Sequence, residues 1–154
     1  MQYSHIHIAN IRLINSAKVG YLSTNGINGY PQSRAMINLR NGVMFKHIVP
    51  FFKQHDNDMT SYFHANNRSN KIEQLTRDTK SSVYYSDFET AHGLLITGHL
   101  TAVTDKAIKH TFWQDKWIDF YPDGVDGSQY ALLKLTPNRA CGWFEHKDFE
   151  YILP

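Results

Sequence analysis

A short polar segment, residues 63–71, brings together the chemical groups that hold phosphate. It joins a strand-like run, Met59–His64, to a helix-like run, Ser69–Arg77. The first turn of a helix exposes N–H groups without intrahelical partners, together with a partial positive charge of roughly half a unit. Ser69 adds a hydroxyl to this turn, and Lys71 adds a full positive charge. The segment is therefore a candidate anion site.

A second cation, Arg34, lies in an earlier strand-like run, Pro31–Arg40. A guanidinium presents a planar fork of donors that suits phosphate oxygens. Arg34 and Lys71 together would match a phosphate monoester, whose charge is roughly −2 at neutral pH. The same residues allow a purely structural interpretation, in which Ser69 caps the helix and both cations are solvated. The residues alone leave both interpretations open.

The pattern of apolar residues predicts many short strands and few helices. Apolar and polar residues alternate between Asn-Gly turns, as is typical of antiparallel strands. The strand-like runs are Lys18–Thr24, Pro31–Arg40, Val43–Phe45, Met59–His64, Ser81–Tyr85, Gly93–Val103, Tyr130–Leu135 and Arg139–Phe144. The helix-like runs are Ser4–Ala17, Ser69–Arg77 and Lys106–Lys116. Without a linker or repeat, the pattern predicts a single domain over residues 1–154, a small antiparallel barrel with peripheral helices.

Composition narrows the possible classes of protein. The formal net charge is only +2 and no long basic run occurs, so nucleic acid is not an expected partner. The single cysteine, Cys141, excludes an internal disulfide, and the nine histidines form no ligand cluster with carboxylates, so no metal site is expected. No apolar run approaches the roughly 20 residues of a membrane span, and no signal-peptide pattern is present. We therefore expect a cytoplasmic protein without a membrane partner.

Several motifs occur in an order that resembles a known family. They are Val19–Thr24, Pro31–Met36, Phe63–Ala65 with Ser69–Lys71, Ile96–Leu100, Asp105–Trp113, and Tyr121–Gly124 followed by Tyr130–Leu135. In order and spacing they resemble the pyridoxamine 5′-phosphate oxidase-like family of flavin-binding split barrels, and within it the general stress protein 26 group. The resemblance runs from about Ile11 to Trp143. It implies a mainly β fold, a six- to seven-stranded antiparallel split β-barrel with two or three helices.

The resemblance also implies a cofactor and an assembly. The cofactor would be FMN, held in a groove at the subunit interface of a homodimer. By position, Arg34 and Lys71 would bind the FMN phosphate, with Ser69 and Asn70 beside them. A small-molecule substrate would then meet the flavin ring.

Other positions would contact the flavin ring itself. Ala35, Met36 and Ile37 would lie along the isoalloxazine edge, giving backbone hydrogen bonds and apolar contact. His64 and Ala65 would lie where the family's second strand touches the cofactor. Family members commonly carry threonine or serine at the position of Ala65, so one hydroxyl contact is missing here.

Further side chains near the presumed groove have two interpretations each. They are the histidines His64, His92 and His99, and the aromatic residues Trp113, Trp117, Phe120 and Tyr121. A histidine there either donates a proton or is structural, and the aromatic residues either cover the flavin or pack in the core. Gly98 would mark a close approach in the central strand.

The C-terminal segment, Gly142–Pro154, lacks the arginine- and histidine-bearing pattern with which true pyridoxamine phosphate oxidases bind substrate. Vitamin B6 oxidation is therefore not expected. We expect an FMN-binding flavoprotein, an oxidoreductase acting on an unknown small substrate, with unassigned catalytic residues. The alternative is a non-catalytic flavin, haem or tetrapyrrole binding or sensor protein. An oligonucleotide-binding barrel would also be small and aromatic-rich, but the near-neutral charge counts against it.

Overall fold

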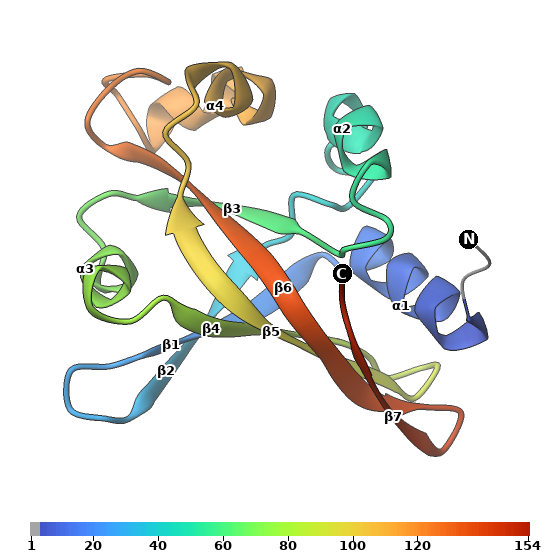
Figure 1. Cartoon of the computed structure of the whole chain (residues 1–154). Helices are drawn as coiled ribbons and strands as arrows, with labels where there is room; N and C mark the ends of the chain where they lie inside the picture. The colour runs from blue at the N-terminus through green and yellow to red at the C-terminus, as the bar shows by residue number, and fades with distance from the viewer. Residues whose placement is uncertain (1–3) are drawn as a thin grey trace.

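A sheet of seven antiparallel strands forms the frame of the computed structural model, which describes residues 4–154 (Figure 1). The strands are β1 Val19–Asn25, β2 Pro31–Ile37, β3 Ser61–Asn66, β4 Lys80–Asp87, β5 His92–Ala102, β6 Tyr130–Phe144 and β7 Lys147–Ile152. The helices in this part of the chain are α1 His5–Ser16, α2 Val49–Lys53, α3 Asn70–Arg77 and α4 Lys106–Phe112, with short 3-10 turns at Lys46–Ile48 and Asp115–Asp119.

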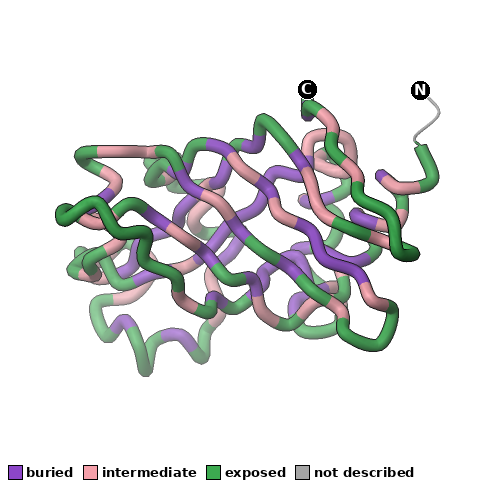
Figure 2. The backbone as a smooth tube through the Cα atoms, turned by 90° about the horizontal axis from the view of Figure 1, so that it is seen from below, coloured by how far each residue is buried: buried purple, intermediate pink, exposed green. Residues whose placement is uncertain are grey.

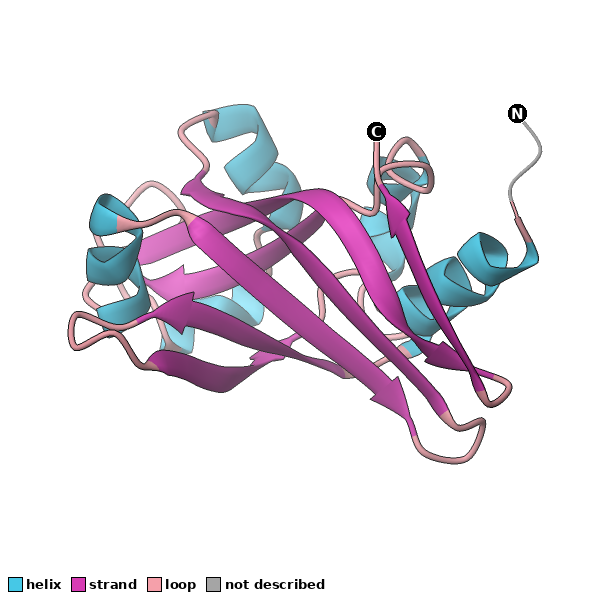
Figure 3. Cartoon of the chain, turned by 60° about the horizontal axis from the view of Figure 1, so that its bottom comes forward, coloured by secondary structure: helices cyan, strands magenta, loops and turns pink. Residues whose placement is uncertain are grey.

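The strands follow the order β2-β1-β4-β5-β6-β3, and β7 also pairs with β6. One edge of β6 pairs with β5, while its other edge pairs first with β3 and then with β7. The end strands β2 and β3 approach each other without joining the hydrogen-bonded path of the described strands. The result is a barrel that is split between these two strands, and Figure 3 shows its curled sheet with helices around the margins.

Two apolar cores hold the sheet in this shape. The first fills the barrel interior with residues that alternate along the strands, among them Leu22, Val83 and Ile96, each fully buried. The second is aromatic and lies where α2, α4 and the 115–119 turn cover the outer face of β3 and β6, with Phe112 and Trp117 at its centre. Burying one such side chain stabilises the fold by about 1.5–3 kcal/mol. Figure 2 shows buried positions following the strands and exposed positions gathering in the turns.

The fold class expected from sequence is confirmed, and several local predictions need correction. Val43–Phe45 forms a turn instead of a strand, and the helical residues 46–53 after it were not predicted. Residues 4–154 thus contain four α-helices, where two or three were expected. The helix expected over Lys106–Lys116 ends at Phe112, because Trp113 is extended (ψ 139°).

The two strands predicted around Pro137–Asn138 are one continuous strand, β6, and β7 was not predicted. Pro137 lies opposite Gly98, where the β5–β6 register shifts at a β-bulge. A proline cannot donate to the ladder, and a bulge is one of the few places where a sheet tolerates it. The turn-like dipeptide therefore marks a bulge in this strand.

Gly98 allows the close approach of β5 to β6, as expected from sequence. A Cβ atom at this position would lie 2.2 Å from the carbonyl oxygen of Thr136 and 2.8 Å from Cα of Pro137. Both atoms belong to the backbone, so neither can move away without distorting β6. Only glycine fits here.

We predict that Gly98→Ala lowers the free energy of unfolding by about 1–3 kcal/mol, because the added methyl overpacks the bulge. Urea unfolding measures this change. Gly42→Ala is the matched control, since its new Cβ would meet only the Val49 side chain, at 3.2 Å. A Gly98→Ala protein as stable as the Gly42→Ala protein would contradict the assignment of close backbone contact.

Candidate functional site

Arg34 projects from β2 toward α3 and is held there by neutral partners. Its Nη1 donates to Oγ1 of Thr24 at 2.7 Å and to the carbonyl of Leu22 at 3.4 Å. Its Nη2 donates to Oε1 of Gln74 at 3.4 Å. Thr24 also donates to Gln74, whose Nε2 donates to Oε1 of Gln32 at 2.6 Å. These contacts orient the guanidinium without neutralising its charge.

Lys71 lies in the first turn of α3, close enough to Arg34 for the two charges to repel. Burial lowers the pKa of Lys71, and the charge of Arg34 lowers it further. Burial likewise lowers the pKa of Arg34. Within residues 4–154, Lys71 makes no hydrogen bond or ion pair, and the first-turn carboxylate of Glu73 pairs with Arg77 instead, at 3.5 Å. Two partly desolvated cations therefore face each other without a counter-charge from the described chain.

Ser69 precedes α3 in the N-cap position, with extended backbone angles (φ −73°, ψ 153°). Its hydroxyl makes no capping hydrogen bond, although that is the usual role of serine at this position. The oxygen is shielded from solvent and has no hydrogen-bond partner among the described residues. An unsatisfied buried hydroxyl costs about 1–3 kcal/mol. It lies at the helix N-terminus, in the same turn as Lys71, where an anionic oxygen would satisfy it.

His64, at the end of β3, is fixed on two sides. Its ring stacks on Trp117 with centroids 4.2 Å apart, and its Nδ1 lies 2.8 Å from the Tyr121 hydroxyl. The Tyr121 hydroxyl both donates and accepts, so it serves either tautomer of this ring. Burial first, and the charge of Lys71 second, lower the pKa of His64 to about 4. His64 is thus a neutral imidazole beside Lys71.

The remaining residues predicted from sequence lie on different faces. Met36 and Ala65 are buried in the barrel core, so only their backbone is available to a ligand. Ala35 and Ile37 point to the outer face of the sheet, and Asn70 is exposed at the start of α3. The structure thus brings together Arg34, His64, Ser69 and Lys71, and it separates the side chains of the others from this cluster.

Sequence reasoning missed the residues that orient Arg34. Thr24 and Gln74 accept from Arg34, and Gln32 accepts from Gln74. Tyr121 was considered only as a residue that covers the flavin or packs in the core, and its contact with His64 was not foreseen. The Asn25–Pro31 hairpin register could have revealed two of them, because it places Thr24 opposite Gln32. Gln74 follows Lys71 by three positions, which is the spacing of one helix face.

An apolar patch covers the outer face of the sheet beside Ala35 and Ile37. We call it the outer-sheet patch; it comprises Tyr21, Ile37, Tyr84 and Trp143, which are 49%, 42%, 36% and 42% exposed. Tyr21 lies opposite both Ala35 and Tyr84 in the ladder. Tyr84 and Trp143 meet over Gly93, where an added Cβ would lie 2.4 Å from the Tyr84 hydroxyl and 2.7 Å from Nε1 of Trp143.

Residues 4–154 contain neither a metal cluster nor a membrane-spanning helix. No group of three or more His, Cys, Asp or Glu side chains there could hold a metal ion. No helix in the same residues is long and apolar enough to span a membrane.

Comparison with known proteins places the chain in a family. Residues 11–153 match the family model described as pyridoxamine 5′-phosphate oxidase like, so the chain belongs to that family. No curated protein matches it in sequence.

Solved structures share the fold. A protein related to general stress protein 26 from Clostridium acetobutylicum is 24% identical (TM-score 0.75; 96% of this chain and 94% of that chain covered). General stress protein 26 from Bacillus anthracis is 17% identical (TM-score 0.70; 96% and 100% covered). A pyridoxamine 5′-phosphate oxidase-related, FMN binding protein from Nostoc punctiforme is 15% identical (TM-score 0.59; 100% of both chains covered).

We predict that the His64 ring titrates near pH 4 and that Lys71→Gln raises its pKa, because removing the neighbouring positive charge removes a repulsion on the imidazolium. The pKa should stay below the ordinary value of about 6.5, since burial remains. Proton NMR of the ring follows the titration, with Lys80→Gln as the control. A midpoint near 6.5 in the unaltered protein would disprove the burial of this ring.

The lowered pKa of His64 makes the free energy of unfolding depend on pH. As pH falls below about 6.5, the unfolded chain binds this proton before the folded chain does. The contribution of His64 to the free energy of unfolding therefore declines between about pH 6.5 and pH 4 and is constant above this range.

Proposed function

We propose that the cluster of Arg34, Ser69 and Lys71 binds the phosphate of FMN and that the protein is an FMN-dependent oxidoreductase. The observation that carries this proposal is the buried hydroxyl of Ser69, which has no partner among the described residues and lies beside two cations without a counter-charge. A dianionic phosphate would accept from the hydroxyl, both cations and the first N–H groups of α3. Family membership and the FMN binding relative support the choice of flavin.

In this proposal each residue has a defined task. Arg34 and Lys71 bind the phosphate, and Thr24 and Gln74 keep the Arg34 fork aimed at it. His64 offers the Nε2 atom of its neutral ring to a polar atom of the cofactor or substrate. FMN supplies hydride or electron transfer when bound. The substrate is a small molecule, and vitamin B6 phosphates are not favoured, because the C-terminal segment lacks the expected arginine and histidine pattern.

The same proposal includes a homodimer with the flavin at its interface. Backbone groups of Ala35 and Ile37 border both the Arg34 cluster and the outer-sheet patch. Exposed aromatic residues grouped on one sheet face are typical of protein interfaces. A second subunit seated on the patch would cover it and form the second wall of a flavin groove.

A comparison of FMN with riboflavin tests the phosphate assignment. Arg34→Ala and Lys71→Ala should each weaken FMN affinity by about 10–100-fold, the range for losing charged hydrogen bonds. Riboflavin has no phosphate, so its affinity should change by less than roughly threefold. Quenching of flavin fluorescence measures both ligands, and Arg77→Ala serves as a control on the same helix. Equal losses for FMN and riboflavin would place the phosphate elsewhere.

Ser69→Ala separates ligand binding from helix capping. The hydroxyl makes no hydrogen bond within the described chain, so removing it should not lower the free energy of unfolding. FMN affinity should fall, because the phosphate loses one donor. Asp105→Ala is the contrasting control: Asp105 caps α4 by accepting from Ala107 and Ile108, and its loss should cost about 1 kcal/mol. A marked loss of stability on Ser69→Ala would contradict the claim that the Ser69 hydroxyl has no hydrogen-bond partner in the described chain.

The dimer is tested on the outer-sheet patch. Tyr21→Glu combined with Tyr84→Glu should convert a dimer to a monomer in analytical ultracentrifugation and should weaken FMN binding, because carboxylates there would be desolvated. Val43→Glu, at a turn residue that is 82% exposed, should change neither property. If the unaltered protein sediments as a monomer at micromolar concentration, the interfacial groove is wrong.

The absorbance spectrum of the purified protein tests the function as a whole. Oxidised-flavin bands that bleach on anaerobic addition of NADH or NADPH are expected. A Soret-type band would instead support a haem-binding protein.

A further inference from the structure

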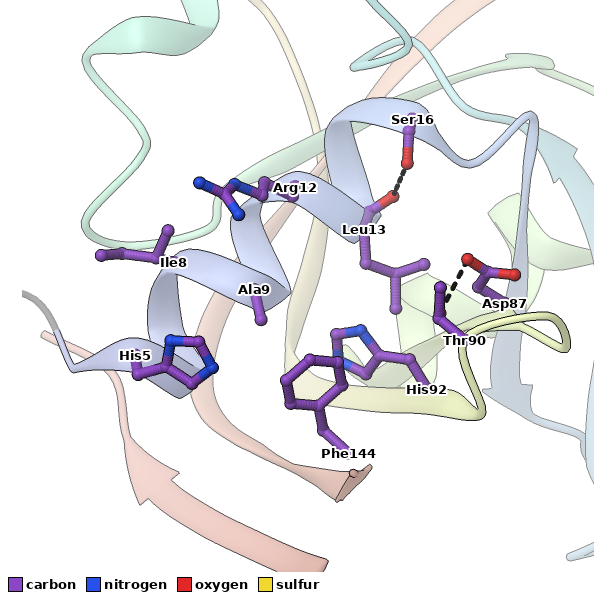
Figure 4. A pocket seen from close by; sticks show the side chains of 10 residues that line it. All are labelled: His5, Ile8, Ala9, Arg12, Leu13, Ser16, Asp87, Thr90, His92 and Phe144. Carbon is purple, nitrogen blue, oxygen red and sulfur yellow. Dashed lines mark hydrogen bonds between the residues drawn. The ribbon is translucent and has the colours of Figure 1, made fainter. Parts of the chain in front are cut away.

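A separate cavity of about 350 Å³ lies between α1, the end of the β4–β5 hairpin and the end of β6 (Figure 4). It shares no residue with the Arg34 cluster, and Figure 1 shows α1 and α3 at opposite ends of the sheet. Its walls include Ile8, Leu13, His92 and Phe144, with Arg12 at the rim. The proposed flavin chemistry makes no use of this space.

The polar wall of the cavity is His92, which is only 4% exposed and is fixed by a buried chain of hydrogen bonds. His92 Nε2 lies 2.7 Å from Oδ1 of Asn10, whose Nδ2 donates to the Tyr151 hydroxyl at 2.9 Å. That hydroxyl lies 3.3 Å from Nδ1 of His7, and His7 Nε2 lies 2.8 Å from the carbonyl oxygen of Asp56. These hydrogen bonds join four parts of the fold: α1, β5, β7 and the turn before β3.

The amide group of Asn10 sets which atoms donate and which accept next to His92. Its nitrogen donates to the Tyr151 hydroxyl, and its oxygen only accepts, so Nε2 of His92 carries the hydrogen of that bond. His92 is left with Nδ1 as a bare acceptor, without a partner among residues 4–154. Burial lowers the pKa of His92 and outweighs the opposing charge of Asp87, so the net shift favours the ring with Nδ1 unprotonated.

The rest of the cavity wall suits a flat ring. The rings of Phe144 and His92 lie with centroids 4.5 Å apart at an interplanar angle of 48°, facing the aliphatic side chains of α1 (Figure 4). The volume is at the lower end of the range for small-molecule sites. An aromatic or heteroaromatic ligand would fill this space better than a flexible polar one.

The two charged side chains at the rim, Asp87 and Arg12, differ in their hydrogen-bond partners. Asp87 is engaged by its own turn, accepting from Thr90 Oγ1 at 2.8 Å and from the N–H of Glu89 at 3.0 Å. Arg12 is exposed and has no hydrogen bond or ion pair with the described residues. Asp87 keeps its negative charge, which acts on His92, and Arg12 is the cation that the cavity offers to an anionic group.

We propose that this cavity is a second binding site, for a small aromatic acid that carries a ring N–H or O–H. The ring donor binds Nδ1 of His92, the ring lies between Phe144 and the aliphatic face of α1, and the carboxylate binds Arg12. The site is independent of flavin.

Three probes separate these contacts: indole-3-acetate, 1-methylindole-3-acetate, which lacks the N–H, and 3-methylindole, which lacks the carboxylate. Binding is measured on the full chain by NMR, with 15N in the histidine rings. Indole-3-acetate should shift the Nδ1 signal of His92. The methylated probe should bind about tenfold more weakly, since one buried hydrogen bond is lost.

Arg12→Ala tests the carboxylate contact without altering the buried chain of hydrogen bonds. It should weaken indole-3-acetate by about fivefold or more and leave 3-methylindole unchanged, whereas Arg77→Ala should affect neither probe. Saturating FMN should not change these affinities. Equal affinity for all three probes, or shifts confined to residues outside the cavity, would overturn the proposal.

Discussion

The repulsion between Arg34 and Lys71 is the constraint on which the rest of the site depends. The fold holds both cations, partly desolvated, at one end of the barrel and directs the nearby carboxylate of Glu73 to Arg77 instead. Keeping like charges together costs free energy unless an anion joins them. Burial keeps His64 neutral with a smaller contribution from Lys71, and the Ser69 hydroxyl nearby is left unsatisfied. One bound phosphate would relieve the repulsion and satisfy the hydroxyl, which is why these separate features point to one ligand.

Neutral partners make this arrangement possible. A carboxylate beside Arg34 would orient the guanidinium equally well, but it would also compete with a phosphate for the fork. Gln74 and Thr24 accept hydrogen bonds from the guanidinium without cancelling its charge, and Gln32 fixes Gln74 in turn. The scaffold supports this end of the barrel through the long β5–β6 pair, whose bulge at Gly98 lets two backbones approach more closely than any side chain would permit.

The sequence predicted the local elements, and it did not predict contacts between residues that are far apart in the chain. The strand before residue 66, the helix after Ser69 and the presence of both cations follow from short-range periodicity and capping residues. The absence of a capping bond at Ser69 and the capture of Glu73 by Arg77 depend on side-chain choices that periodicity does not encode. The contact between Tyr151 and His7 joins residues 144 positions apart, and β7 was missed because its pattern is indistinguishable from a loosely polar tail. Pro137 was misread as a turn, since only the position of Gly98 on the neighbouring strand shows that it lies at a bulge.

The C-terminal segment is part of the barrel, and this limits its role in substrate binding. β7 pairs with the second half of β6 through residues 147–152, and Leu153 is buried against the barrel core. Tyr151 is committed to Asn10 and His7. A segment so engaged cannot also reach over the flavin site to select a substrate. Under the proposed function, substrate selection would therefore fall to residues near His64 and to a partner surface, and a flavin held mainly by its phosphate would remain open on its substrate side. The proposed site would then specify its cofactor more narrowly than its substrate.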